Sequence, residues 1–152
     1  METIRVRVNG SPSEDRVDTS QLLVHYLRDV HGLTGTPPPC GTSRCGACMV
    51  LMDGMTVMSC TLLAVQADGT DIETIEGVEA HGEHAIRRAL SEAGAEPCAD
   101  CIAGRIIVAD EMLRRKVRPT RGEVVRALAG NRCACSSAEA FVHAVLMVAG
   151  GA

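Results

Sequence analysis

The sequence predicts an α+β fold, in which a half built of strands and one helix precedes a half built of helices. Through roughly the first 75 residues, apolar residues alternate on either side of Asn9-Gly10 and Asp53-Gly54, dipeptides typical of tight hairpin turns. After Gly77 the apolar residues instead recur at helical spacing. A chain of 152 residues, 46% apolar and 22% charged, can bury one core or two small ones.

The first half is expected to open with a hairpin and a helix. Apolar residues alternate along residues 3–9, which predicts a strand, and a short return strand is expected around Val17. Ser20 is the expected N-cap of a helix whose apolar residues recur at i, i+3, i+4 and i+7 and which ends at Gly32.

A second hairpin and a closing strand complete this half. A loop rich in Gly and Pro is expected over residues 34–46. Strands are expected over residues 48–52 and 55–60 on either side of Asp53-Gly54, and a last strand over residues 71–75.

Four helices are expected in the second half, and so many helices in about 70 residues indicate a compact four-helix bundle. Thr120 and Glu123 form a capping box at the start of the third helix, and Ser136 and Glu139 do so at the start of the fourth. The expected spans are residues 84–93, 99–116, 120–130 and 136–150. The boundary between the halves is placed near residues 76–82.

Composition excludes several classes of function. The formal net charge of −4 and the presence of only one Tyr and one Phe leave no basic or stacking surface for nucleic acid. No apolar run is long enough to span a bilayer, and the sequence opens without an apolar signal region, so a cytoplasmic protein is expected. The chain has no Ser–His–Asp set, P-loop or dinucleotide fingerprint, so we expect no catalytic residues of its own.

Eight cysteines in two tight groups indicate metal binding, because thiols stay reduced in the cytoplasm. The first group follows the C-x4-C-x2-C spacing, with a more distant fourth cysteine, that is typical of plant-type [2Fe–2S] sites. Zinc sites favour two C-x2-C pairs, and this group has only one. The expected ligands are Cys40, Cys45, Cys48 and Cys60.

The second group pairs a C-x2-C with a C-x-C about thirty residues further on. Both pairs lie near predicted helix starts, where unpaired N–H groups and the helix dipole stabilise an anionic cluster. Spacing alone leaves zinc and iron–sulfur open, since four thiolates suit both. The expected ligands are Cys98, Cys101, Cys133 and Cys135.

The chain resembles the small iron–sulfur subunit of molybdenum hydroxylases, the xanthine oxidase and aerobic carbon monoxide dehydrogenase family. The similarity spans nearly the whole length and includes the C-x2-C and C-x-C motif of the second group. It is carried also by residues 27–36 (LRDVHGLTGT), 40–50 (CGTSRCGACMV), 59–69 (SCTLLAVQADG) and 71–77 (DIETIEG).

The resemblance implies a ferredoxin-like β-grasp domain over residues 1–78 and a helical domain over residues 79–152, each holding one [2Fe–2S] cluster. It implies an iron–sulfur subunit of an oxidoreductase complex, in which substrate is oxidised at the molybdenum cofactor of a large subunit. Electrons then pass through the helical-domain cluster and the β-grasp cluster to FAD on a medium subunit.

The chain departs from the family pattern around the second group. Pro97 stands where the family has a Gln that lies beside the pterin, and Pro offers neither an amide side chain nor a backbone N–H. The family's Cys-Arg-Cys-Thr-Gly is replaced here by CACSS over residues 133–137. The ligands are kept while their pterin-facing surroundings differ. Two alternatives stay open: a free ferredoxin-like carrier, and a protein with one [2Fe–2S] cluster and a structural zinc.

Overall fold

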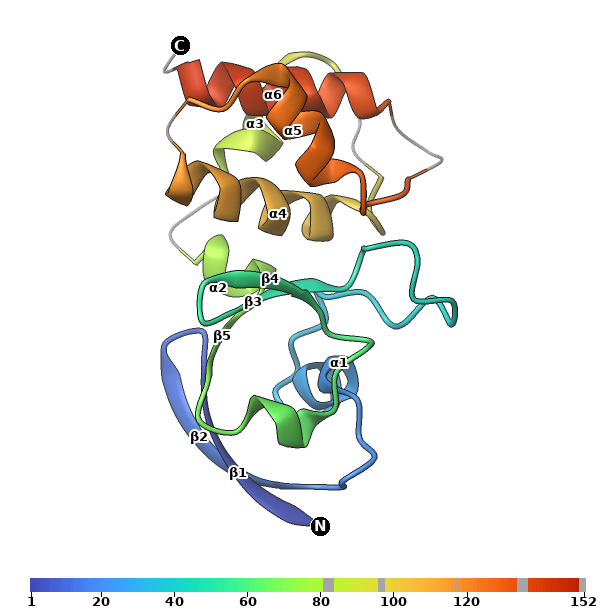
Figure 1. Cartoon of the computed structure of the whole chain (residues 1–152), viewed down its shortest axis with the longest axis vertical. Helices are drawn as coiled ribbons and strands as arrows, with labels where there is room; N and C mark the ends of the chain where they lie inside the picture. Colours follow the sequence, from blue (N-terminus) through green and yellow to red (C-terminus); the bar gives the residue numbers. More distant parts are fainter. Residues whose placement is uncertain (81–83, 96–97, 117, 134–136, 151–152) are drawn as a thin grey trace.

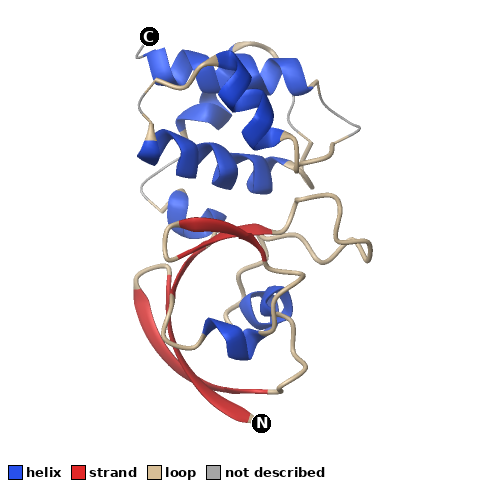
Figure 2. Cartoon of the chain, in the orientation of Figure 1, coloured by secondary structure: helices blue, strands red, loops and turns tan. Residues whose placement is uncertain are grey.

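The computed structural model of the chain describes residues 1–80, 84–95, 98–116, 118–133 and 137–150, and it confirms the predicted α+β fold class (Figure 1). Within these residues, the strands lie in the half that holds the N-terminus, and the other half is built of helices (Figure 2).

Five strands form one mixed sheet in the order β2-β1-β5-β3-β4. Strands β1 and β5 are parallel, and the other neighbours are antiparallel. Positive φ angles at both residues of Asn9-Gly10 and of Asp53-Gly54 confirm the two predicted tight turns. The strands are β1 (Glu2–Val8), β2 (Ser11–Val17), β3 (Met49–Met52), β4 (Met55–Met58) and β5 (Asp71–Glu73).

One helical segment packs on the inner face of this sheet. It begins as α1 (Leu23–His25) and continues as a π-helical turn over Tyr26–Val30. The prediction of Ser20 as its N-cap was wrong: the hydroxyl and backbone N–H of Ser20 both donate to Asp18 Oδ1, at 2.6 and 2.8 Å. A Ser held by the preceding Asp is not available as a cap, and the helix begins two residues later. A short 3₁₀ turn over Ala64–Ala67, which the sequence did not predict, follows the second hairpin.

Five described helices follow the sheet, and none is long and apolar enough to cross a bilayer. The short α2 was not predicted, because its first residue was assigned to the last strand. The capping box of Thr120 and Glu123 is confirmed, whereas Ser136 lies outside the described residues. The helices are α2 (Ile75–Val78), α3 (Ala85–Glu92), α4 (Ile102–Arg115), α5 (Arg121–Leu128) and α6 (Ala138–Gly150).

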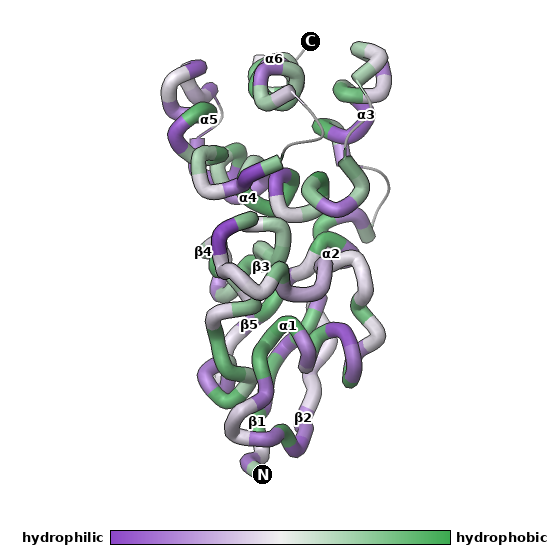
Figure 3. The backbone as a smooth tube through the Cα atoms, turned by 90° about the vertical axis from the view of Figure 1, so that its right-hand side faces the viewer, coloured by the Kyte–Doolittle hydropathy of each residue, from purple (hydrophilic) through white to green (hydrophobic). Residues whose placement is uncertain are grey.

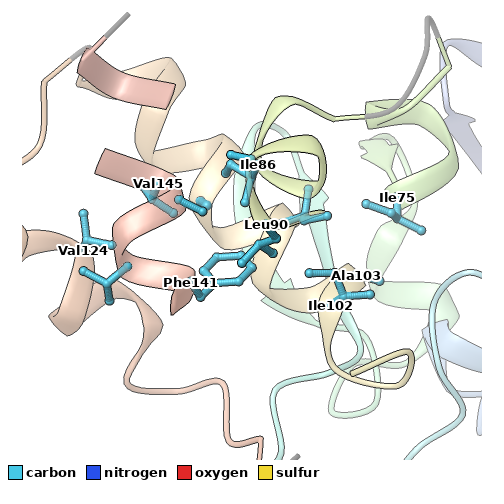
Figure 4. Packing of buried hydrophobic residues seen from close by; sticks show 13 residues of the cluster. Ile75, Ile86, Leu90, Ile102, Ala103, Val124, Phe141 and Val145 are labelled. Carbon is cyan, nitrogen blue, oxygen red and sulfur yellow. The ribbon is translucent and has the colours of Figure 1, made fainter. Parts of the chain in front are cut away.

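The helical half has its own hydrophobic core, to which α2, α3, α4, α5 and α6 all contribute. The ring of Phe141 lies near its middle, between Val124 and Leu90 (Figure 4). The sheet half has a separate core, in which α1 and its π-helical turn cover the apolar face of β1 and β5. Each half therefore buries apolar surface of its own.

Helix α4 joins the two halves, because it lies between the sheet and the helices α3, α5 and α6 (Figure 3). Near its C-terminal end, the Glu111 carboxylate accepts the Thr56 backbone N–H at 2.9 Å, and Arg114 forms a bidentate ion pair with Glu73 at 2.8 and 2.9 Å. Near its N-terminal end, α4 approaches the sheet half at Gly104, which has no side chain. A Cβ placed on Gly104 would lie 2.4 Å from the carbonyl oxygen of Gly46 and 2.7 Å from that of Ala47. Only glycine allows α4 to approach the sheet half this closely.

Replacing Gly104 by Ala should therefore lower the free energy of unfolding, by about 1–3 kcal/mol, because the added methyl meets backbone atoms that cannot rotate away. Equilibrium denaturation would measure the change. Gly122→Ala on α5 is a matched control, since its Cβ meets nothing closer than 3.5 Å, and it should stabilise the chain by up to about 1 kcal/mol. Equal effects of the two substitutions would contradict the close contact.

Candidate metal centres

The first cysteine set lies where the loop before β3 meets the turn after β4. Cys48 immediately precedes β3, and Cys60 lies two residues after β4. Ser59 extends the pairing of these strands, because its backbone N–H and hydroxyl both donate to the Cys48 carbonyl oxygen, at 3.2 and 2.7 Å. The hairpin thereby brings Cys60 beside Cys48.

The loop carrying the other two cysteines curls around the Cys40 sulfur. Its backbone has positive φ at Gly41, Ser43 and Gly46. The Thr42 hydroxyl lies 3.2 Å from Cys40 Sγ, and the hydroxyl together with backbone N–H groups of residues 42, 44 and 45 lowers the pKa of this thiol to about 5. Donors already directed at sulfur favour the thiolate, which is the form that binds iron.

The remaining thiols of this set lie deeper. Cys48 is 2% exposed, and burial, together with the neighbouring Cys60 thiol, raises its pKa to about 11. Burial also raises the pKa of Cys45, which in addition feels the charges of Cys40 and Cys60. Sulfurs that disfavour one another's ionisation are suited to a shared cationic centre, which removes that repulsion.

The second cysteine set lies at the N-terminal end of α4. The Sγ atoms of Cys98, Cys101 and Cys133 all lie within 4.8 Å of one another. Cys98 and Cys101 are joined by a turn in which the backbone N–H groups of Cys101 and Ile102 donate to the Cys98 carbonyl oxygen, at 3.1 and 2.9 Å. This turn is why α4 begins later than predicted. Cys135, the fourth expected ligand, and Pro97 lie outside the described residues.

The donor chemistry of this second set fits a metal–thiolate centre. Burial, followed by the neighbouring Cys133 and Cys98 thiols, raises the pKa of the Cys101 thiol. None of the seven described cysteines forms a disulfide. Tetrahedral metal–sulfur bonds of about 2.3 Å place two thiolates on one metal roughly 3.8 Å apart, so three sulfurs gathered this closely can converge on one centre. The geometry alone suits zinc as well as iron.

The two sets meet at a junction made almost entirely of backbone. The side-chain amide of Asn131 donates to the Gly46 carbonyl oxygen at 2.6 Å, and the Arg132 backbone N–H donates to the Cys45 carbonyl oxygen at 2.8 Å. A Cβ on Gly46 would lie 2.3 Å from the carbonyl oxygen of Gly130. The segment just before Cys133 is therefore bonded directly to the loop that carries Cys45.

Sequence reasoning missed two residues of this region, Asn131 and Arg105. Both are buried, at 6% and 4% exposed. For Arg105 the signal was present, because a single charge interrupts the apolar stretch of residues 102–109 (IAGRIIVA). For Asn131, no local sequence pattern indicates a hydrogen-bond partner 85 residues away.

Comparisons with known proteins cover both halves. A family model described as a 2Fe-2S iron-sulfur cluster binding domain matches residues 6–75, and one described as a [2Fe-2S] binding domain matches residues 74–146. The nicotine 6-hydroxylase small subunit of Paenarthrobacter nicotinovorans is 39% identical over 94% of this chain and 87% of that protein. The xanthine dehydrogenase iron-sulfur-binding subunit of Escherichia coli O157:H7 is 35% identical over 95% of this chain and 92% of that protein.

Solved structures agree with these sequence matches. A chain of quinoline 2-oxidoreductase from Pseudomonas putida 86 superposes with a TM-score of 0.90 at 36% identity, over 99% of this chain and 94% of that chain. The aldehyde oxidoreductase from Desulfovibrio gigas also superposes with a TM-score of 0.90, at 34% identity, but there the match covers 99% of this chain and only 17% of the longer one.

Removing the amide of Asn131 should weaken the junction. Asn131→Ala should lower the free energy of unfolding by about 1–3 kcal/mol, because the Gly46 carbonyl loses a buried donor. Asn131→Asp should cost more at neutral pH, since a carboxylate cannot donate and would face that carbonyl oxygen. Chemical denaturation of the three proteins measures the order. An Asn131→Ala chain as stable as the wild type would show that this bond does not hold the halves together.

Proposed function

Because this chain belongs to the small [2Fe–2S] iron–sulfur subunits of molybdenum hydroxylases, the xanthine oxidase and aerobic carbon monoxide dehydrogenase family, we propose that it relays electrons through two [2Fe–2S] clusters. It is the non-catalytic subunit of an oxidoreductase complex. The observation that carries the proposal is that three thiols of the second set gather within 4.8 Å of one another across a backbone junction from the loop of the first set. In the first set, Cys40 neighbours Cys45 and Cys48 neighbours Cys60.

In this proposal each half of the chain holds one cluster. Residues 1–78 form the β-grasp domain, whose ligands are Cys40, Cys45, Cys48 and Cys60. Residues 79–152 form the helical domain, whose ligands are Cys98, Cys101, Cys133 and Cys135. A [2Fe–2S] cluster bound at either site takes up and releases one electron at a time. Donors directed at Cys40 and the burial of Cys48 are features of the first site, and such hydrogen bonds and burial influence the potential of a cluster held there.

The chain itself supplies a short connection between the two ligand sets. Arg132 is bonded covalently to Cys133, and its backbone N–H donates to the carbonyl oxygen of Cys45 at 2.8 Å. Covalent bonds and one hydrogen bond therefore link a ligand of one set to a ligand of the other. The same contact fixes the separation of the two sites, so that electron transfer between them needs no motion of the chain.

The partners we propose are a large subunit with the molybdenum cofactor and a medium subunit with FAD. Two relatives are themselves named as small or iron–sulfur-binding subunits. In the aldehyde oxidoreductase from Desulfovibrio gigas, the region that matches this chain is 17% of a much longer chain. A unit that is fused to a larger enzyme in one protein and separate in another is expected to work against that larger enzyme.

We predict about four irons and four acid-labile sulfides per chain, because each four-thiolate set takes one [2Fe–2S]. Metal and sulfide analysis of the purified chain, together with its visible absorption, measures this directly. Cys60→Ser and Cys101→Ser are matched variants, one from each set, and each should lower the iron content by about half.

Zinc is the specific alternative at the second set, since three sulfurs within 4.8 Å also suit a zinc site. Two irons and one zinc per chain, with the zinc lost in Cys101→Ser, would rule out the second cluster. A chain that holds both clusters but copurifies with no larger subunit would favour a free electron carrier.

A further inference from the structure

The loop that carries Cys40 begins in a short stem, residues 34–36, which charged side chains hold from two directions. The first is Arg28, in the π-helical turn that follows α1. Its Nη1 donates to the carbonyl oxygens of Thr34 and Thr36, at 2.9 and 2.6 Å, and Thr36 is buried. A π-helical turn is rare in proteins and is often found beside functional sites. Arg28 fixes the stem to the sheet half.

The second contact with the stem comes from α2, the segment that leads into the helical half. One oxygen of the Glu76 carboxylate accepts the backbone N–H of Gly35 at 2.6 Å. The stem also packs tightly here, since a Cβ placed on Gly35 would lie 2.6 Å from Cγ2 of Ile75. Ile75 is buried and belongs to the hydrophobic core of the helical half. Two consecutive residues of α2 therefore attach the stem to the helical half.

The Glu76 carboxylate is itself held in place. Its other oxygen accepts the hydroxyl of Thr74 at 2.6 Å, and Thr74 is fully buried. The side-chain amide of Asn9 donates to that hydroxyl at 3.0 Å and accepts the Thr74 backbone N–H at 2.8 Å. Because its second oxygen is already bonded to a fixed partner, the carboxylate is pre-organised to receive the stem.

Three consecutive prolines, residues 37–39, join the stem to Cys40. Each proline ring fixes φ at about −65°, and a run of prolines behaves as a semi-rigid spacer. The position and direction of the stem are therefore passed on to Cys40, which is the exposed cysteine of the first set. A flexible linker of the same length would let Cys40 move independently of residues 34–36.

We propose that Glu76 is a positioning residue for the first centre: it holds the stem so that Cys40 lies where it can bind a cluster together with the other three thiols of its set. This inference rests on the first of the two proposed clusters, whose four expected ligands all lie among the described residues. Glu76 acts through the backbone of residues 34–36 and the prolines that follow, with no bond or proton change of its own. The helical half thereby supports a centre to which it supplies no ligand.

The first measurement is hydrogen exchange of the full chain, read at the amides of residues 34–45. Glu76→Ala removes the acceptor of the Gly35 N–H, so exchange there should become about tenfold faster. Glu76→Asp is one methylene shorter and should behave like Glu76→Ala, whereas Glu76→Gln keeps an acceptor and should stay close to the wild type. Glu73→Ala is the matched control, because this carboxylate also joins the halves but pairs with Arg114 of α4. It should leave this exchange unchanged.

The second measurement is the loss of iron from the first set, when the full chain is incubated with bipyridyl as a chelator. The EPR signal that Cys60→Ser removes identifies the first centre. In Glu76→Ala and Glu76→Asp that signal should decay about tenfold faster, because the stem no longer holds Cys40 in place. In Glu76→Gln and Glu73→Ala it should decay as in the wild type. The signal that remains in Cys60→Ser is the internal reference and should decay equally in all variants.

Wild-type exchange and wild-type iron loss in Glu76→Ala would overturn the proposal. Faster exchange with unchanged iron loss would overturn it as well, because the contact would then hold the stem without supporting the centre. Equal effects of Glu73→Ala and Glu76→Ala would show that any link between the halves suffices, and Glu76 would have no role of its own. If Cys60→Ser loses no iron relative to the wild type, the first cluster itself is disproved, and the role of Glu76 with it.

Discussion

A close backbone approach of three glycine-containing segments determines how the two halves of this molecule can be arranged. A Cβ on Gly104 of α4 would collide with the carbonyl oxygens of Gly46 and Ala47, and a Cβ on Gly46 would collide with that of Gly130. With no side chains to separate them, the Arg132 N–H and the Asn131 amide reach carbonyl oxygens of the opposite loop. The segments that carry the two cysteine sets are thus held next to each other by these hydrogen bonds, as the proposed relay between two redox centres requires.

On the two sides of this contact, the cysteines lie in different surroundings. The first set is wrapped by an irregular loop whose N–H groups point at the Cys40 sulfur, while Cys48 and Cys60 come from the hairpin beneath it. The second set is gathered by a turn and a helix start, with the guanidinium of Arg105 buried nearby. Hydrogen bonds and burial are means by which a protein sets the potential of a cluster, and in these respects the surroundings of the two cysteine sets differ.

The sequence predicted what local patterns encode. Asn-Gly and Asp-Gly dipeptides predicted both hairpin turns, where the structure has positive φ angles. The capping box at Thr120 predicted the start of α5. Cysteine spacing grouped the thiols that the structure brings together, as far as it describes them. The prediction at Ser20 failed because the neighbouring Asp18 competes for the same hydroxyl. The bond from Asn131 to Gly46 joins residues 85 positions apart, so only tertiary structure could reveal it.

EPR of the purified protein, poised at a series of potentials, tests most directly whether one chain holds two adjacent clusters. When the first centre is reduced alone, a single S = 1/2 signal is expected. When both are reduced, that signal should split, because two unpaired spins held across the Cys45–Arg132 contact interact magnetically. Spin integration should then approach about two per chain, one for each [2Fe–2S]. One unsplit signal that never exceeds one spin per chain would contradict the two-centre relay.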